Sequence, residues 1–181
     1  HNLYADTELV RDVIDSRGFK FLQPGPQPLY PFGFDQNNWS TGANKITIQY
    51  SDFTTVIWKM DGDRYSRFII DAYSSEKEAV AHNFISQDGN YTDILSSETI
   101  VVIQGALYKD KATTLPSILT VGIGDLFIFN NGNYVQGTWR RTDLSESFEF
   151  FDLNQYPIEV PPSSQWIHIV PNEGQIVWSN S

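Results

Sequence analysis

The sequence predicts a mainly β fold: a sandwich or a partly open barrel of antiparallel strands with one short N-terminal helix, which is α+β by element count. First, the chain is rich in residues that favour strands, with 12 Phe, 9 Tyr and 5 Trp besides many Val, Ile and Thr. Second, apolar and polar residues alternate with period two from residue 45 onward. Third, turn sequences separate the apolar runs at intervals of about 8–12 residues, as in sandwiches and barrels.

Residues 1–44 are predicted to form a helix and a connection that packs on the β domain. A capping residue, Asp6 or Thr7, and a closing Gly18 bracket the helical pattern. A helix this short is marginal alone, so we expect tertiary contacts to hold it. Residues 23–44 are rich in Pro and Gly but also in aromatic residues, which predicts an irregular connection along the domain surface. The apolar residues at helical spacing are Leu9, Val10, Val13 and Ile14.

Residues 45–181 are predicted to form one antiparallel β domain. Asp61-Gly62 and Asn131-Gly132 each lie between two alternating segments and predict hairpins. The apolar run over 97–104 predicts a buried strand. Residues 76–84 are predicted to form a short helix with Ala79, Val80 and Phe84 facing inward. Further strands are expected at 147–151, 157–160, 166–170 and 175–178.

Composition excludes several classes of protein. The chain has 22 acidic and 12 basic residues, a net charge of −10 and no basic tract, which argues against nucleic-acid binding. Cysteine is absent, so there is no disulfide, thiolate metal site or thiol nucleophile. No apolar run approaches the roughly 18 residues of a transmembrane segment. Phosphate-binding glycine loops and a serine-hydrolase elbow are also absent, and no cofactor is predicted.

No metal site is predicted. The three histidines, His1, His82 and His168, lack the spacing of a transition-metal site. His168 alternates with isoleucines, which predicts a position on the outer face of its strand. His1 is interpreted either as part of a cleft completed by a preceding region or as an arbitrary start. The turns at 61–63 and 87–90 carry oxygen ligands, but turn chemistry explains them without Ca²⁺.

Two interpretations are open for the polar residues on strands. Carboxylate pairs, Glu149 with Asp152 or Asp61 with Asp71, would suit glycoside hydrolysis, although a solvated acidic face explains them equally. Arginine next to aromatic residues would suit an anionic ligand or a glycan, although packing and ion pairing explain it too. The candidate ligand-binding residues are Trp39, Tyr65, Arg67, Trp139, Arg140 and Arg141.

Several blocks of the sequence together resemble the YerB-type bacterial lipoproteins, a family of unknown function. They are the opening His1-Asn2-Leu3-Tyr4; Trp58, Asp61, Tyr65 and Arg67; residues 98–104; residues 125–129 with Asn131-Gly132; Gly137-Thr138-Trp139-Arg140-Arg141; Phe150 and Asp152; and residues 166–171. The segment 71–97 departs from the family pattern, so nothing is carried over to it. The resemblance covers most of residues 1–171 and is densest from 125 onward.

The resemblance implies a location and a set of partners. The chain is expected to be extracytoplasmic, anchored through a lipidated cysteine upstream of His1, and to follow an N-terminal half of the same polypeptide. The leading hypothesis is a non-catalytic module that binds a cell-envelope glycan or protein. The alternative is a hydrolase-like enzyme whose active site, around His1 and Tyr4, is shared with that N-terminal half.

Overall fold

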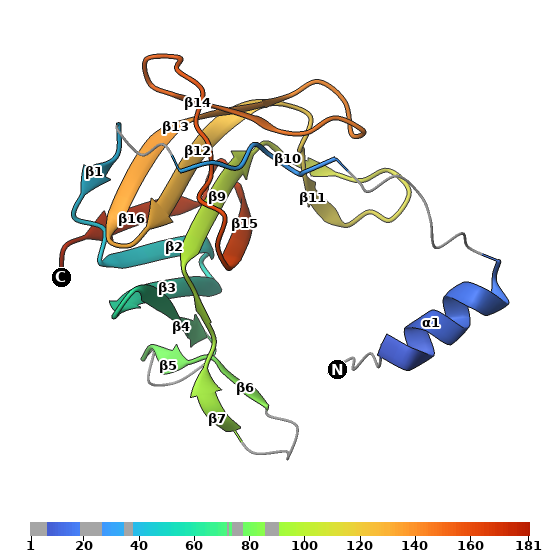
Figure 1. Ribbon diagram of the computed structural model, residues 1–181, viewed down its shortest axis with the longest axis horizontal. Coiled ribbons are helices and arrows are strands. Elements are labelled where there is room, and N and C mark those ends of the chain that lie inside the picture. Colours follow the sequence, from blue (N-terminus) through green and yellow to red (C-terminus); the bar gives the residue numbers. More distant parts are fainter. Residues whose placement is uncertain (1–6, 19–26, 35–37, 72, 74–77, 86–90) are drawn as a thin grey trace.

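The computed structural model describes residues 7–18, 27–34, 38–71, 73, 78–85 and 91–181. The predictions for His1, Tyr4, the cap at Asp6 and the turn at 87–90 lie outside these ranges. Strands dominate the described residues, and two open sheets form the body of the protein (Figure 1). The predicted mainly β fold with one short helix is therefore confirmed.

The first sheet has the order β1-β13-β12-β9-β15, with β14 also paired to β13. Its pairs are antiparallel except for β9 and β15, which run parallel. The Asn131-Gly132 hairpin joins β12 to β13, and both turn residues have the positive φ, 47° and 72°, that such a turn requires. The strands are β1 (Ser40–Thr41), β9 (Thr99–Gly105), β12 (Gly122–Asn130), β13 (Asn133–Arg141), β14 (Glu149–Asp152) and β15 (Gln165–Pro171).

The second sheet has the order β16-β2-β3-β4-β5, with β8 paired to β4. The predicted hairpin at Asp61-Gly62 is confirmed between β3 and β4. The strands are β2 (Lys45–Ser51), β3 (Thr54–Asp61), β4 (Arg64–Asp71), β5 (Val80–Ala81), β8 (Ser96–Ser97) and β16 (Gln175–Ser179). Two small ribbons complete the fold, formed by β6 (Asn83–Ile85) with β7 (Tyr91–Ile94) and by β10 (Leu107–Lys109) with β11 (Pro116–Ile118).

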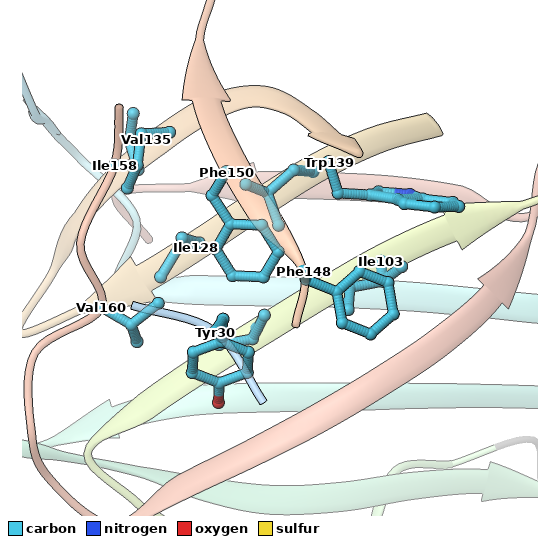
Figure 2. Packing of buried hydrophobic residues seen from close by; sticks show 11 residues of the cluster. Tyr30, Ile103, Ile128, Val135, Trp139, Phe148, Phe150, Ile158 and Val160 are labelled. Carbon is cyan, nitrogen blue, oxygen red and sulfur yellow. The ribbon is translucent and has the colours of Figure 1, made fainter. Parts of the chain in front are cut away.

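The core has two parts, one on each face of the first sheet. Strand β9 is buried along its whole length because its side chains alternate between them: Ile100 and Val102 face the second sheet, and Val101 and Ile103 face the other way. On that other face, Tyr30 and residues from the segment 148–160 cover the sheet (Figure 2). The predicted buried strand over 97–104 is thus confirmed as the centre of the molecule.

Two predicted elements differ from the structure. Residues 80–85 form β5 and β6 instead of a helix, and Val80 and Phe84 are exposed rather than inward-facing. The backbone N–H of His82 donates to the Arg67 carbonyl at 2.9 Å, so pairing along β4 outweighs the weak helical pattern. Residues 157–160 form isolated bridges at Pro157 and Val160 rather than a strand.

The predicted helix is confirmed as α1 (Thr7–Ser16), and it closes at Gly18, whose φ is +67°. Its apolar residues Leu9, Val10 and Val13 are exposed. Figure 1 shows α1 lying apart from both sheets. Among the described residues these side chains do not bury an apolar stripe against the sheets, and the packing of residues 1–44 on the domain stays a prediction. We infer that burial against the sheets does not stabilise α1.

Candidate functional site

The side chains of β15 alternate between the inner and the outer face of the first sheet, and this alternation positions the site. His168 lies opposite Val102 of β9, and its side chain points between the sheets and is only 1% exposed. The prediction that His168 lies on the outer face is wrong. The neighbours Ile167 and Ile169 carry that outer face, 36% and 42% exposed. Trp166 shares the parity of His168, so its bulk and that of the imidazole fill the space between the sheets.

His168 is held by two hydrogen bonds from the second sheet. The Trp58 indole Nε1 donates to His168 Nε2 at 2.8 Å. The Tyr50 hydroxyl is hydrogen-bonded to His168 Nδ1. An indole nitrogen can only donate, so Nε2 carries no proton, and a neutral imidazole must carry its proton on Nδ1. Nδ1–H therefore donates to the Tyr50 oxygen, and the hydroxyl proton of Tyr50 is directed elsewhere.

Arg67 lies beside this pair. It is the cross-strand neighbour of Trp58 on β4, and its guanidinium carbon lies 5.9 Å from the Trp58 ring centroid and 5.0 Å from that of Trp166. One terminal nitrogen is hydrogen-bonded to Nδ1 of His82. Its Nε is buried and has no hydrogen-bond partner among the described residues. A buried donor without a partner costs free energy. It therefore indicates either a strained side chain or a position where an acceptor from a ligand would bind.

These residues, Tyr50, Trp58, Arg67, His82, Trp166 and His168, are called the Arg67 cluster. Burial and then the nearby Arg67 charge lower the pKa of His168 to about 3. The same two causes, in the same order, lower the pKa of His82. Burial raises the pKa of Tyr50 to about 12, against an opposing effect of Arg67. At neutral pH the cluster therefore presents one charge, the guanidinium of Arg67.

The described residues bring no carboxylate to that charge. Their ion pairs join Arg64 to Glu98 and Arg140 to Glu149. Burial lowers the pKa of Arg67, as expected for a cation that lacks an anionic neighbour. An acceptor that brought its own negative charge would relieve this penalty. The arrangement is therefore suited to binding an anionic group against aromatic rings.

The other candidate residues lie elsewhere and have structural partners. The buried Tyr65 hydroxyl donates to the Ala43 carbonyl at 2.9 Å, and the Trp139 indole donates to the Gln104 carbonyl at 2.7 Å. The exposed Arg140 pairs with Glu149. Two further residues pack against their surroundings, since Arg141 stacks on Phe148 and donates to backbone carbonyls, and Trp39 packs against the covered core.

Only Arg67 among the six predicted residues thus belongs to the cluster. Sequence reasoning missed Tyr50, Trp58, His82, Trp166 and His168 as site residues. One signal was available, because Trp166, His168 and Val170 are alternate residues and so lie on the same face of their strand. A Trp at that parity favours the inner face over the outer.

The described part of the chain holds neither a cluster of metal-ligating side chains nor a membrane-spanning helix. No group of three or more His, Cys, Asp or Glu side chains there is placed to hold a metal ion. No helix there is long and apolar enough to cross a bilayer.

Known proteins were compared with the chain. A family model described as the C-terminal domain of proteins of unknown function (DUF3048) matches residues 45–167. The crystal structure of the YerB protein from Bacillus subtilis matches with a TM-score of 0.61 at 14% identity, over 94% of this chain and 53% of that one. At that identity the similarity shows the fold alone, and this chain spans about half the length of that structure. No curated protein matches.

Proposed function

The chain belongs to the DUF3048 C-terminal domain family, and from this premise we propose that it is a non-catalytic module that binds an anionic group of a cell-envelope glycan. The observation that carries the proposal is the Arg67 guanidinium. It lies beside two indole rings that contact each other, lacks a carboxylate partner among the described residues and keeps a buried Nε unpaired there. The arginine fork matches carboxylate and phosphate groups, and of the two rings the half-buried Trp166 suits the apolar face of a sugar, since Trp58 is fully buried.

Binding is favoured over hydrolysis by the chemistry of the cluster. Glycoside hydrolysis needs two carboxyl groups about 5–10 Å apart. The groups that surround Arg67 are two imidazoles, a phenol and two indoles. The imidazoles are neutral at pH 7, because burial and Arg67 lower the pKa of each. These neutral imidazoles, fixed by hydrogen bonds, can orient a ligand. They do not supply the pair of carboxyl groups that glycoside hydrolysis uses as acid and base.

The proposal includes a location and a partner. We place the domain outside the cytoplasm, on a polypeptide anchored through a lipidated cysteine upstream of His1, because of its likeness to YerB-type lipoproteins. The family description calls the matched region a C-terminal domain, which supports an N-terminal region of the same polypeptide as a partner. Labelling the full-length protein with a radioactive fatty acid in cells tests the anchor, and an unlabelled protein would contradict it.

The binding proposal is tested with sugars that carry a negative charge and with one that does not. Glucuronate and methyl glucoside are titrated into labelled protein while the Trp166 indole N–H resonance is followed by NMR. We expect glucuronate, and glucose 6-phosphate, to shift that resonance with millimolar affinity, and methyl glucoside to leave it in place. The affinity should fall as salt is added, since charge carries the contact.

Arg67→Gln is the decisive variant. A hydrogen bond to a charged group contributes about 1.5–3 kcal/mol, so the variant should bind glucuronate at least tenfold more weakly. Arg140→Gln is the matched control, because Arg140 also stacks on an aromatic ring, 4.9 Å from the Phe151 centroid. Equal binding by wild type and Arg67→Gln would refute the proposal. Cleavage of a glycoside by the full-length protein would favour the hydrolase instead.

A further inference from the structure

A cavity of about 340 Å³ lies at the edge of the first sheet, away from the Arg67 cluster. That volume is within the range of small-molecule sites, roughly 300–1,000 Å³. Its polar lining comes from β1 and the residues before it, from β13, and from the end of β14 with the following turn. These lining residues are Asn38, Ser40, Tyr134, Gln136, Asp152 and Asn154. Apart from Asp152, none of these was a candidate from the sequence.

The cavity fills a gap in strand pairing. Strand β1 pairs with β13 at Asn133 and Tyr134, and β14 pairs with the same edge from Gly137 onward. Val135 and Gln136 have no strand partner on this edge in the described part of the chain. Successive residues of a strand point their N–H and C=O groups to opposite edges, so one of the two presents them to the cavity. A gap of two residues is too short to pair with a peptide strand, which favours a compact ligand.

Asp152 is fixed before any ligand arrives. It is 5% exposed, and its Oδ1 accepts hydrogen bonds from the backbone N–H groups of Asn154 and Tyr156 at 2.8 and 2.9 Å. Its Oδ2 meets the Asn38 amide at 3.4 Å, near the limit of a hydrogen bond. Oδ2 is thus a buried anionic oxygen, rigidly held at the cavity, with lone pairs for further donors.

We propose that this cavity binds the ring of a neutral sugar. No Lys, Arg or His is among the described residues that line it, and the Asp152 carboxylate repels anions. The carboxylate accepts from hydroxyl groups, while Asn, Gln and Ser side chains both donate and accept, as adjacent sugar hydroxyls require. The inference does not rest on the Arg67 proposal, because no residue is shared between the two sites.

The experiment titrates labelled protein with the methyl glycosides of glucose, galactose, mannose and N-acetylglucosamine. We expect at least one of them to shift the backbone amides of Gln136 and Asn154 in proton–nitrogen spectra, with millimolar affinity. Gln136→Ala removes one exposed hydrogen-bonding side chain and should weaken binding roughly three- to tenfold. Gln175→Ala, at an exposed position of β16, is the matched control and should bind as the wild type does.

Asp152→Asn provides a second variant, because an amide oxygen still accepts from the turn while the charge is lost. Its spectrum reports whether the fold is retained, and binding should weaken by at least as much as in Gln136→Ala. Three results would overturn the proposal. They are no shift at Gln136 with any glycoside, wild-type affinity in both variants, or a shift with ethylammonium chloride and with none of the glycosides. Ethylammonium is a small cation without hydroxyl groups, so that last result would mean that the Asp152 carboxylate binds cations instead of a sugar. Failure here leaves the glucuronate response at Trp166 unaffected, so the two sites are judged separately.

Discussion

Trp58 and His168 join the two sheets through one buried hydrogen bond, from the indole Nε1 to the imidazole Nε2 at 2.8 Å. Because the donor cannot also accept, the bond fixes the tautomer of His168 and, through Nδ1, the direction of the Tyr50 hydroxyl. The bond thereby links β3 and β15, two strands far apart in the sequence, across the core. The bond has consequences that can be measured.

We expect the free energy of unfolding to fall as the pH drops below about 6.5, with His168 as a main cause. Burial holds the pKa of His168 near 3 in the fold, so the unfolded chain binds the extra proton between these two values. The group should remove about 1.4 kcal/mol per pH unit inside that window. Urea unfolding at pH 7 and pH 5 measures this loss.

His168→Gln should flatten that dependence, since glutamine can replace both hydrogen bonds and does not titrate. His82→Gln is the control: the pKa of His82 is also lowered, but this residue is only half-buried, so most of the slope should remain. Parallel slopes for wild type and His168→Gln would contradict the assignment.

The imidazole of His168 is expected to be the neutral Nδ1–H tautomer at pH 7. Nitrogen spectra of the imidazole should show a protonated Nδ1 and an unprotonated Nε2. Trp58→Phe leaves the buried Nε2 without its donor and should destabilise the fold by about 1–3 kcal/mol beyond the loss of ring area. A protonated Nε2 in the wild type would show that the hydrogen-bond assignment is wrong.

Two neighbours on β13 should differ sharply in their contribution to stability. Trp139→Phe removes a buried hydrogen bond to the Gln104 carbonyl and should cost about 1–3 kcal/mol. Arg140→Ala removes an exposed ion pair with Glu149 and should cost less than about 1 kcal/mol. Urea unfolding of the two variants gives the comparison, and equal losses would contradict the structural role of Trp139.

Gly137→Ala should separate β14 from β13. A Cβ at this position would lie 1.9 Å from the carbonyl oxygen of Phe151, which is backbone and cannot rotate away. The expected loss is about 3 kcal/mol, at the upper end of the usual overpacking range. Gly62→Ala is the control, because no heavy atom lies within 4 Å of its added Cβ. Its only cost in stability is the strain of an alanine at a positive φ of 65°. A smaller loss for Gly137→Ala than for Gly62→Ala would argue against the close approach of β14.

Deleting residues 1–18 should leave the free energy of unfolding of the sheets unchanged within about 0.5 kcal/mol. The apolar side chains of α1, such as Leu9 and Val13, are exposed and so add no burial to the sheets. Chemical denaturation of the shortened chain, which keeps the buried Tyr30, checks this. A loss above 1 kcal/mol would show that the helix packs against the domain in solution.

Local patterns predicted much of the fold because many strands here obey local rules. The Asn131-Gly132 turn and the buried run of β9 carry signals within a few residues, and both were predicted correctly. The segment around Val80 was not, since its strand conformation depends on hydrogen bonds to β4 that no local pattern contains.

The site was harder to predict than the fold. Its residues come from β2, β3, β4, β15 and, for His82, the link between β5 and β6. Only the packing of one sheet on the other brings Tyr50, Arg67 and His168 together. Arg67 was predicted as a ligand residue from its type and its resemblance to a family block. Its unpaired Nε and its indole neighbours depend on tertiary structure, which the sequence does not display.

The last two strands each complete a different sheet. Strand β15 adds to β9 at the edge of the first sheet, and β16 adds to β2 at the edge of the second, after a turn of three residues. Neither sheet is therefore complete until β15 and β16 have left the ribosome. Pairings this distant in sequence fold slowly, so the nascent chain must keep two exposed sheet edges from aggregating until both strands have been made.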